Sequence, residues 1–271
     1  PSEKLEAEIE LWRTIARRLP IRVHGIVITD SPDRLEWAAE VLSTSGPRLR
    51  WLGVKRFADG SLGGHTAAMR DSFADADGLG TYRLTSADEA IARRSVEMGG
   101  IAAIHAIGDR AVSGVLDTFE RLIAGGAEPA ALRMEHVSII DPPLLERFAR
   151  LGVTAVIQPA FLASENQWVA ARVGPEREAW VYPFRSMRQL GIPMAGSSDC
   201  PVEPPHPLWG MASAIDRFGI TPTEALDPLT ALDLFTGTTR VAQEFKLRGA
   251  TVTAVDSARY SEMFGRTWIE A

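Results

Sequence analysis

The chain has 271 residues, a length typical of one large α/β domain. Its 29 basic and 35 acidic residues give a net charge of −6 and form no Lys/Arg block, which argues against a nucleic-acid partner. A single cysteine excludes an intrachain disulfide framework, and no apolar run is long enough to cross a bilayer, so we expect a cytoplasmic protein with no membrane contact.

Helix and strand patterns alternate along the chain. Apolar residues at helical spacing predict an amphipathic helix over residues 3–19, which Pro20 ends. Six apolar runs predict buried strands, at residues 21–28, 52–59, 102–105, 133–139, 153–160 and 192–199. Capping residues and apolar stripes predict the other helices, which start at Pro32, at a Ser86–Glu89 capping box and at Ala111, and which cover residues 142–151, 183–190, 207–217 and 229–245.

Two connections are longer than ordinary links between elements. Residues 60–84 follow the second strand and begin in a Gly-rich segment, and residues 161–181 follow the fifth strand. Long loops over a rigid scaffold often serve as lids, so we expect both to border the substrate pocket.

Alternating strands and helices favour a parallel sheet covered by helices. The α/β fold we expect first is a (β/α)8 TIM barrel, with a doubly wound open sheet as the alternative. Only six strands are predicted before residue 200, so the barrel is incomplete, with about six βα units in residues 1–245. Residues 246–271 lack this alternation and are interpreted as a C-terminal tail, a remnant of a small β domain.

Charged and imidazole side chains stand at or near the ends of four predicted strands. They are Lys55, His105, His136 and Asp199. Neutral imidazoles and anionic oxygens are the ligands of a divalent metal, and a catalytic site leaves one position open for water. From the residues alone, Lys55 could instead be a solvated cation and Asp199 a helix N-cap.

Six segments in order carry a family resemblance. They read VKRFADGSLGGHTA, IHAIGDRA, RMEHVS, IQPAF, YPFRSM and GSSDCPVEPPHPLWG. Over about residues 50–245 the chain resembles the amidohydrolase superfamily, specifically its YtcJ-like branch of metal-dependent hydrolases, which includes N-substituted formamide deformylases. The resemblance implies the (β/α)8 barrel and one or two divalent ions, zinc first among them.

The resemblance also implies roles for the four strand-end residues. Lys55 matches a lysine that is carboxylated in many members and then binds metal, and His105 and His136 match metal-binding histidines. Asp199 matches the aspartate that acts as general base, close enough to the metal to count among its ligands.

The chain departs from the family pattern at its beginning. Members carry His-x-His at the end of the first barrel strand, and the five histidines here form no such pair. The six strands therefore match the third to eighth of the family barrel. The first residue is Pro1 and not methionine, which favours a segment of a longer protein. Without the His-x-His pair we expect this chain alone to be a poor catalyst.

Other residues are weaker candidates for the site. His65 and His206 lie in loops over the same barrel face, and Gln158, Trp168 and Arg185 complete the predicted substrate contacts. Strand alternation turns Glu135 to the face opposite His136, away from the barrel axis. His24 is interpreted as a core histidine or a pocket wall, and Asp109, Arg110 and Cys200 are given no chemical role.

The function that these residues and the resemblance favour is hydrolysis of C–N bonds in amides or formamide-like small molecules. A metal would polarise the carbonyl and activate water, and Asp199 would pass the water proton to the leaving amine. Ester or phosphoester hydrolysis on the same scaffold is one alternative. A non-catalytic barrel remnant that serves as a binding or regulatory module is another, and a homo-oligomer is possible for any of them.

Overall fold

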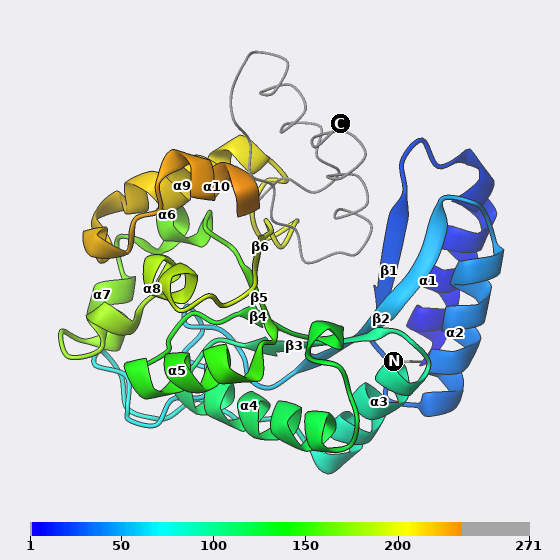
Figure 1. Ribbon diagram of the computed structural model, residues 1–271, viewed down its shortest axis with the longest axis horizontal. Helices are drawn as coiled ribbons and strands as arrows, with labels where there is room; N and C mark the ends of the chain where they lie inside the picture. The colour runs from blue at the N-terminus through cyan, green and yellow to red at the C-terminus, as the bar shows by residue number, and fades with distance from the viewer. Residues whose placement is uncertain (1, 235–271) are drawn as a thin grey trace.

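The computed structural model describes residues 2–234, and its centre is a curled sheet of six parallel strands (Figure 1). The strands follow one another in chain order and are β1 (Val23–Val27), β2 (Leu49–Phe57), β3 (Ile101–Ala106), β4 (Leu132–His136), β5 (Thr154–Ile157) and β6 (Met194–Gly196). A doubly wound sheet reverses its strand order at a switch point, and this sheet never does. The fold is therefore the expected incomplete barrel, a curled half-barrel of six βα units.

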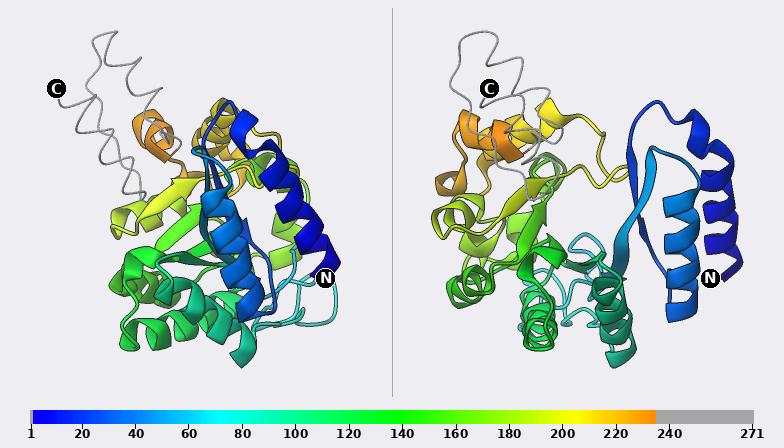
Figure 2. Two further views of the ribbon diagram at one scale, coloured as in Figure 1. Left: turned by 90° about the vertical axis from the view of Figure 1, so that its right-hand side faces the viewer. Right: turned by 45° about the vertical axis from the view of Figure 1, so that its right-hand side comes forward.

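Helices line the outer side of the curled sheet, as the two turned views show (Figure 2). Those before β5 are α1 (Ser2–Ile15), α2 (Pro32–Thr44), α3 (Ser86–Glu97), α4 (Asp109–Ala124) and α5 (Pro142–Leu151). Those after it are α6 (Phe161–Glu165), α7 (Val169–Val173), α8 (Phe184–Gln189), α9 (Pro207–Asp216) and α10 (Pro228–Leu234), and short 3-10 turns join several of them. β1 with α1 and α2 forms one end of the arc, and β6 with α9 and α10 forms the other.

Local signals explain where several helices begin. The Asp141 carboxylate accepts the Leu144 N–H at the start of α5, whose first residue is Pro142. The predicted capping box of α3 is displaced by one residue, because Thr85 has an extended backbone and exchanges its hydrogen bonds with Asp88. Glu89 instead pairs with arginines on the helix surface.

The two faces of the sheet have different chemistry. Outward side chains such as Val54, Ile104 and Met134 are fully buried against the helices. The strand register places Lys55 and His105 on the inner face, since Lys55 pairs with Ala103 and His105 with Glu135. The inner face near the strand ends therefore carries the polar side chains.

Other details differ from the sequence-based expectation. The predicted loop 161–181 contains α6 and α7, whereas residues 60–84 form turns and bends with no helix or strand. The helix predicted at 229–245 is seen as α10 up to Leu234, and the tail 246–271 lies outside the described residues. Within the described residues, β1 has a strand neighbour on one side only, and no helix there is long and apolar enough to cross a membrane.

Candidate active site

The two predicted ligand histidines lie together where β3 and β4 end. The ring centroids of His105 and His136 are 4.4 Å apart, with their planes at 67°. Register alone would set them on opposite faces, because His136 pairs with Ala106. The backbone at His136 is left-handed, with φ 76°, and Val137 follows with φ 51°. This turn at the strand end breaks the alternation and brings the His136 ring to the His105 side.

His136 is held in the form that a metal requires. His136 is 4 % exposed. The Phe161 ring, at the start of α6, stacks on the imidazole with ring centroids 5.9 Å apart. Burial, followed by repulsion from His105 and Lys55, holds the pKa of His136 well below its usual value. The buried Nδ1 atom has no partner at hydrogen-bond geometry within the described residues, while the Gln158 side chain lies beside the ring and acts to raise its pKa. A neutral imidazole with an unpartnered nitrogen is suited to ligate a metal.

Lys55 faces the same space from β2. Burial lowers the pKa of its ammonium, while attraction to Glu135 and Asp199 acts in the opposite direction. Asp199 is exposed and lies three residues beyond the end of β6, with a left-handed backbone of φ 53°. The charge of Asp199 thus acts on the pKa of Lys55, and the charges of Lys55 and His105 act on the pKa of His136. The four strand-end residues are therefore close enough for their charges to affect one another.

Glu135 lies on the inner face, which corrects the sequence-based expectation. It shares a register row with His105, is 5 % exposed and pairs with Arg133 at 2.7 Å. The expectation assumed regular alternation between Glu135 and His136, and the left-handed turn at His136 removes it. Arg133 neutralises the Glu135 carboxylate next to Lys55.

Asp59 is a neighbour of the site to which sequence analysis assigned no role. Its Oδ1 atom lies 3.1 Å from His105 Nε2, and the Gly60 carbonyl oxygen lies 2.8 Å from the same nitrogen. Its position as the last residue of a predicted strand, before a glycine, is the only signal that the sequence offers.

The residues fit a divalent metal in part. No three His, Cys, Asp or Glu side chains in residues 2–234 converge as a metal-binding group. The two histidines therefore need a ligand of another kind, and Lys55 is the candidate that lies within their electrostatic reach.

Two of the predicted substrate residues lie near the end of β6. Gln158 is 2 % exposed, and its amide donates to Ser197 Oγ at 3.0 Å and to the Val156 carbonyl at 3.2 Å. His206 accepts the Trp209 N–H as the N-cap of α9 and also lines a cavity of about 150 Å³. The remaining lining includes Ala160, Ser197, Ser198 and Gly210, so this cavity adjoins Asp199 in the chain.

The long loop 60–84 is held against α7 by hydrogen bonds and an ion pair. Arg172 pairs with Asp75 at 2.7 Å and donates to the carbonyl groups of Leu62 and Gly63. Two predicted substrate residues belong to this contact, because His65 pairs with Asp75 at 3.1 Å and the Trp168 ring lies 5.1 Å from the Arg172 guanidinium. Arg185 is different. It is exposed on α8, which packs against α5 in the outer layer, and the structure does not bring it to the histidines.

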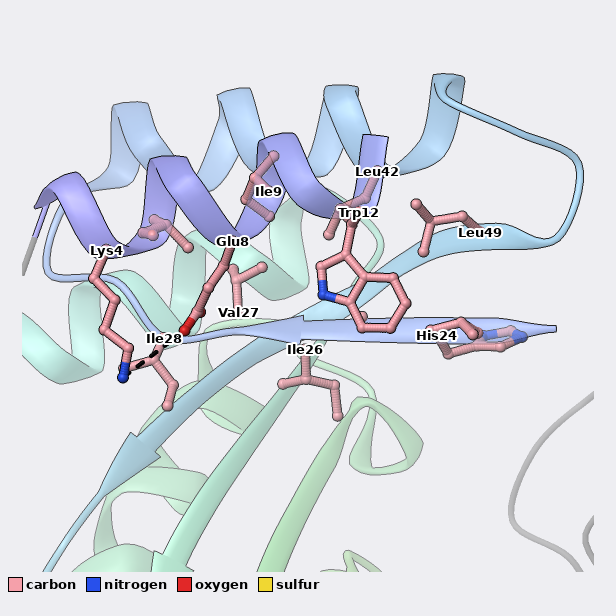
Figure 3. Close-up of a pocket in the computed structure, with 13 residues that line it drawn as sticks. Lys4, Glu8, Ile9, Trp12, His24, Ile26, Val27, Ile28, Leu42 and Leu49 are labelled. Carbon is pink, nitrogen blue, oxygen red and sulfur yellow. Dashed lines mark ion pairs between the residues drawn. The ribbon is translucent and has the colours of Figure 1, made fainter. Parts of the chain in front are cut away.

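A larger groove of about 440 Å³ lies at the other end of the sheet, between α1 and β1 (Figure 3). Trp12 and Glu8 from α1 and His24 from β1 form part of its wall. His24 is exposed, so the pocket-wall interpretation holds and the core interpretation is wrong. The two predicted ligand histidines are not among the residues that line this groove.

Comparison with known proteins gives a consistent family assignment. The model of the Amidohydrolase family matches residues 2–248. The YtcJ protein of Bacillus subtilis is 31% identical over 252 residues, which are 89% of this chain and 46% of that protein. The N-substituted formamide deformylase of Arthrobacter pascens is 30% identical over 155 residues, 54% of this chain and 28% of the enzyme.

A solved structure shows the same fold. An uncharacterized metal-dependent hydrolase from Pyrococcus furiosus superimposes with a TM-score of 0.72 and 33% identity, covering 85% of this chain and 47% of the other. The chain thus spans about half the length, or less, of these relatives. The family model, the sequence relatives and the half-barrel agree, and the chain belongs to the Amidohydrolase family.

Proposed function

We propose that this chain carries the metal site of a hydrolase that cleaves C–N bonds in small amide or formamide-like molecules. The observation that carries the proposal is the buried His136, neutral and with an unpartnered Nδ1, 4.4 Å from a second imidazole at the carboxyl edge of a parallel sheet. His105, His136 and Lys55 would hold a divalent ion, zinc in the first instance. The named relatives support this chemistry, since one is a formamide deformylase and one a metal-dependent hydrolase.

Lys55 is suited to become the third ligand as a carbamate. The neutral amine attacks CO₂, forms an N–C bond and releases one proton, which leaves an anionic carboxylate on nitrogen. Burial lowers the pKa of Lys55 and so favours the amine that reacts. The new anion would face Glu135, whose charge is already compensated by Arg133 at 2.7 Å.

Asp199 is the proposed general base. A divalent metal, when bound, supplies Lewis-acid activation of the substrate carbonyl and of water. The Asp199 carboxylate takes a proton from the attacking water and returns it to the departing amine nitrogen. The cavity beside Ser197, Ser198 and His206 would seat the substrate next to this carboxylate.

The test is turnover by the chain supplied with zinc and bicarbonate, on matched N-formyl, N-acyl and ester substrates. We expect slow metal-dependent release of amine, because the family's His-x-His pair is missing, and its loss on chelation and in His136→Ala. His24→Ala is the matched control, because it removes an exposed histidine outside this site. Asp199→Asn should lower turnover and leave the metal bound. Turnover that survives chelation, or that His136→Ala leaves intact, would refute the proposal, and a preference for esters would select the ester-hydrolase alternative.

One observation favours a second candidate, a non-catalytic binding module. Residues 2–234 hold no third His, Cys, Asp or Glu side chain that converges with the two histidines. A chain that binds metal and substrate analogues tightly but releases no product on any substrate of the panel would identify this candidate.

A further inference from the structure

The Asp59 carboxylate is fixed by three backbone N–H groups. Oδ2 accepts from Ala68 at 2.9 Å and from Gly108 at 2.8 Å, and Oδ1 accepts from Ile107 at 3.1 Å. The residue is 2 % exposed. These donors come from the long loop and from the exit of β3, so the carboxylate is held from two sides. Charge-assisted hydrogen bonds of this kind define its orientation closely.

The same carboxylate and the Gly60 carbonyl together determine which nitrogen of His105 carries a proton. Nε2 of His105 lies 3.1 Å from Asp59 Oδ1 and 2.8 Å from the Gly60 carbonyl oxygen. Both neighbours are acceptors, and an acceptor nitrogen between them would be repelled. Nε2 therefore carries the hydrogen, and in the neutral ring Nδ1 keeps the lone pair.

We propose that Asp59 is a positioning residue that fixes His105 as the Nε2–H tautomer, so that Nδ1 is the nitrogen presented to the metal. This rests on the proposed metal site for its second half, while the tautomer is a property of the metal-free chain. Partners that hold the other ring nitrogen of a ligand histidine typically change metal affinity by about 10- to 100-fold.

Asp59→Asn perturbs this arrangement in a defined way. An amide NH₂ in the Oδ2 position would meet the N–H groups of Ala68 and Gly108, whereas in the Oδ1 position it would meet the Ile107 N–H and His105 Nε2–H. Of these four donors only the His105 ring can carry its hydrogen on another nitrogen, so the second orientation is the one that can be relieved, and it directs an N–H at His105 Nε2. The ring then loses its exclusive Nε2–H tautomer or turns away from Asn.

Asp109→Asn is the matched control. Asp109 is 1 % exposed, and its Oδ1 accepts the N–H groups of Arg70 and Arg110, both at 2.9 Å. It resembles Asp59 in burial and in its backbone donors, but the hydrogen bonds of its carboxylate do not include the His105 ring. A loss of stability should appear in both variants, whereas a change in the His105 tautomer should appear in Asp59→Asn alone.

The experiment combines long-range ¹H–¹⁵N spectra of the metal-free chain with titration by Co²⁺ alone. The five histidines are assigned by single substitutions. We expect Nε2–H at His105 in the wild type and in Asp109→Asn, a changed tautomer in Asp59→Asn, and a 10- to 100-fold weaker cobalt affinity in Asp59→Asn alone.

Two results would overturn the inference. The first is a spectrum of the wild type that shows the His105 proton on Nδ1. The second is an unchanged tautomer and cobalt affinity in a folded Asp59→Asn. If the tautomer changes as expected and the wild type binds no cobalt, Asp59 still sets the tautomer and the proposed metal site is the part that fails.

Discussion

Replacement of Glu165 by glutamine should change how folding stability depends on pH. Glu165 lies on α6, one turn after the Phe161 ring that stacks on His136, and Tyr182 donates to its Oε2 at 2.7 Å. Burial raises the pKa of Glu165 from the ordinary 4.5 to about 7, although the Tyr182 hydrogen bond lowers it. At about 1.4 kcal/mol per pKa unit, this difference corresponds to about 3 kcal/mol.

The sign follows from the direction of the pKa change. A carboxyl group whose pKa is higher in the folded state contributes stability that is complete below pH 4.5 and lost as pH rises through about 7. Glutamine stays neutral at every pH. Glu165→Gln should therefore raise the free energy of unfolding by about 1 kcal/mol at pH 5 and by about 3 kcal/mol at pH 8.

Urea unfolding at pH 5, 6, 7 and 8 measures this difference, and the comparison of variant with wild type cancels other titrating groups. Glu146→Gln on the exposed face of α5 is the control and should change the free energy of unfolding by less than about 0.5 kcal/mol throughout. A Glu165→Gln curve parallel to the wild-type curve from pH 5 to pH 8 would show that the carboxyl group titrates normally and that the argument from burial is wrong.

Two further predictions concern the long loop and the open edge. Arg172→Gln removes charged hydrogen bonds worth about 1.5–3 kcal/mol. Proteolysis within residues 60–84 should therefore become about tenfold faster or more. The control, Arg188→Gln at an exposed position, should be cleaved at the wild-type rate. Ile28 is 56% exposed next to β1, which has one free edge in the described sheet; Ile28→Lys should reduce any concentration-dependent association in sedimentation velocity. Equal cleavage rates, or identical sedimentation of Ile28→Lys and wild type, would contradict these two predictions.

The sequence was sufficient for the features that depend on the order of elements. Strand ends of a parallel sheet meet at one edge, so the proximity of His105 and His136 could be predicted from their places in two neighbouring strands. The sequential strand order likewise follows from the repeated strand–helix pattern. These features need only local periodicity and the usual connection rules.

Features that depend on tertiary contacts could not be predicted. The inner-face position of the His136 ring depends on the left-handed backbone at His136, a turn that no local sequence signal predicts, and the Phe161 ring stacks on it there. The role of Asp59 depends on backbone donors nine to 49 residues away. Helices α6 and α7 are five residues each, too short to show a helical period, and Arg172 contacts across the loop hold α7 in place.

The central claim is that His105 and His136 belong to a metal site, and zinc binding to the purified chain tests it most directly. Equilibrium dialysis with elemental analysis, in the presence of bicarbonate, should show zinc bound to the wild type and to His24→Ala. His136→Ala should bind at least tenfold more weakly, because it removes the ligand whose buried Nδ1 has no protein partner within residues 2–234. Zinc retained equally by His136→Ala and the wild type, or no zinc bound by the wild type, would contradict the account.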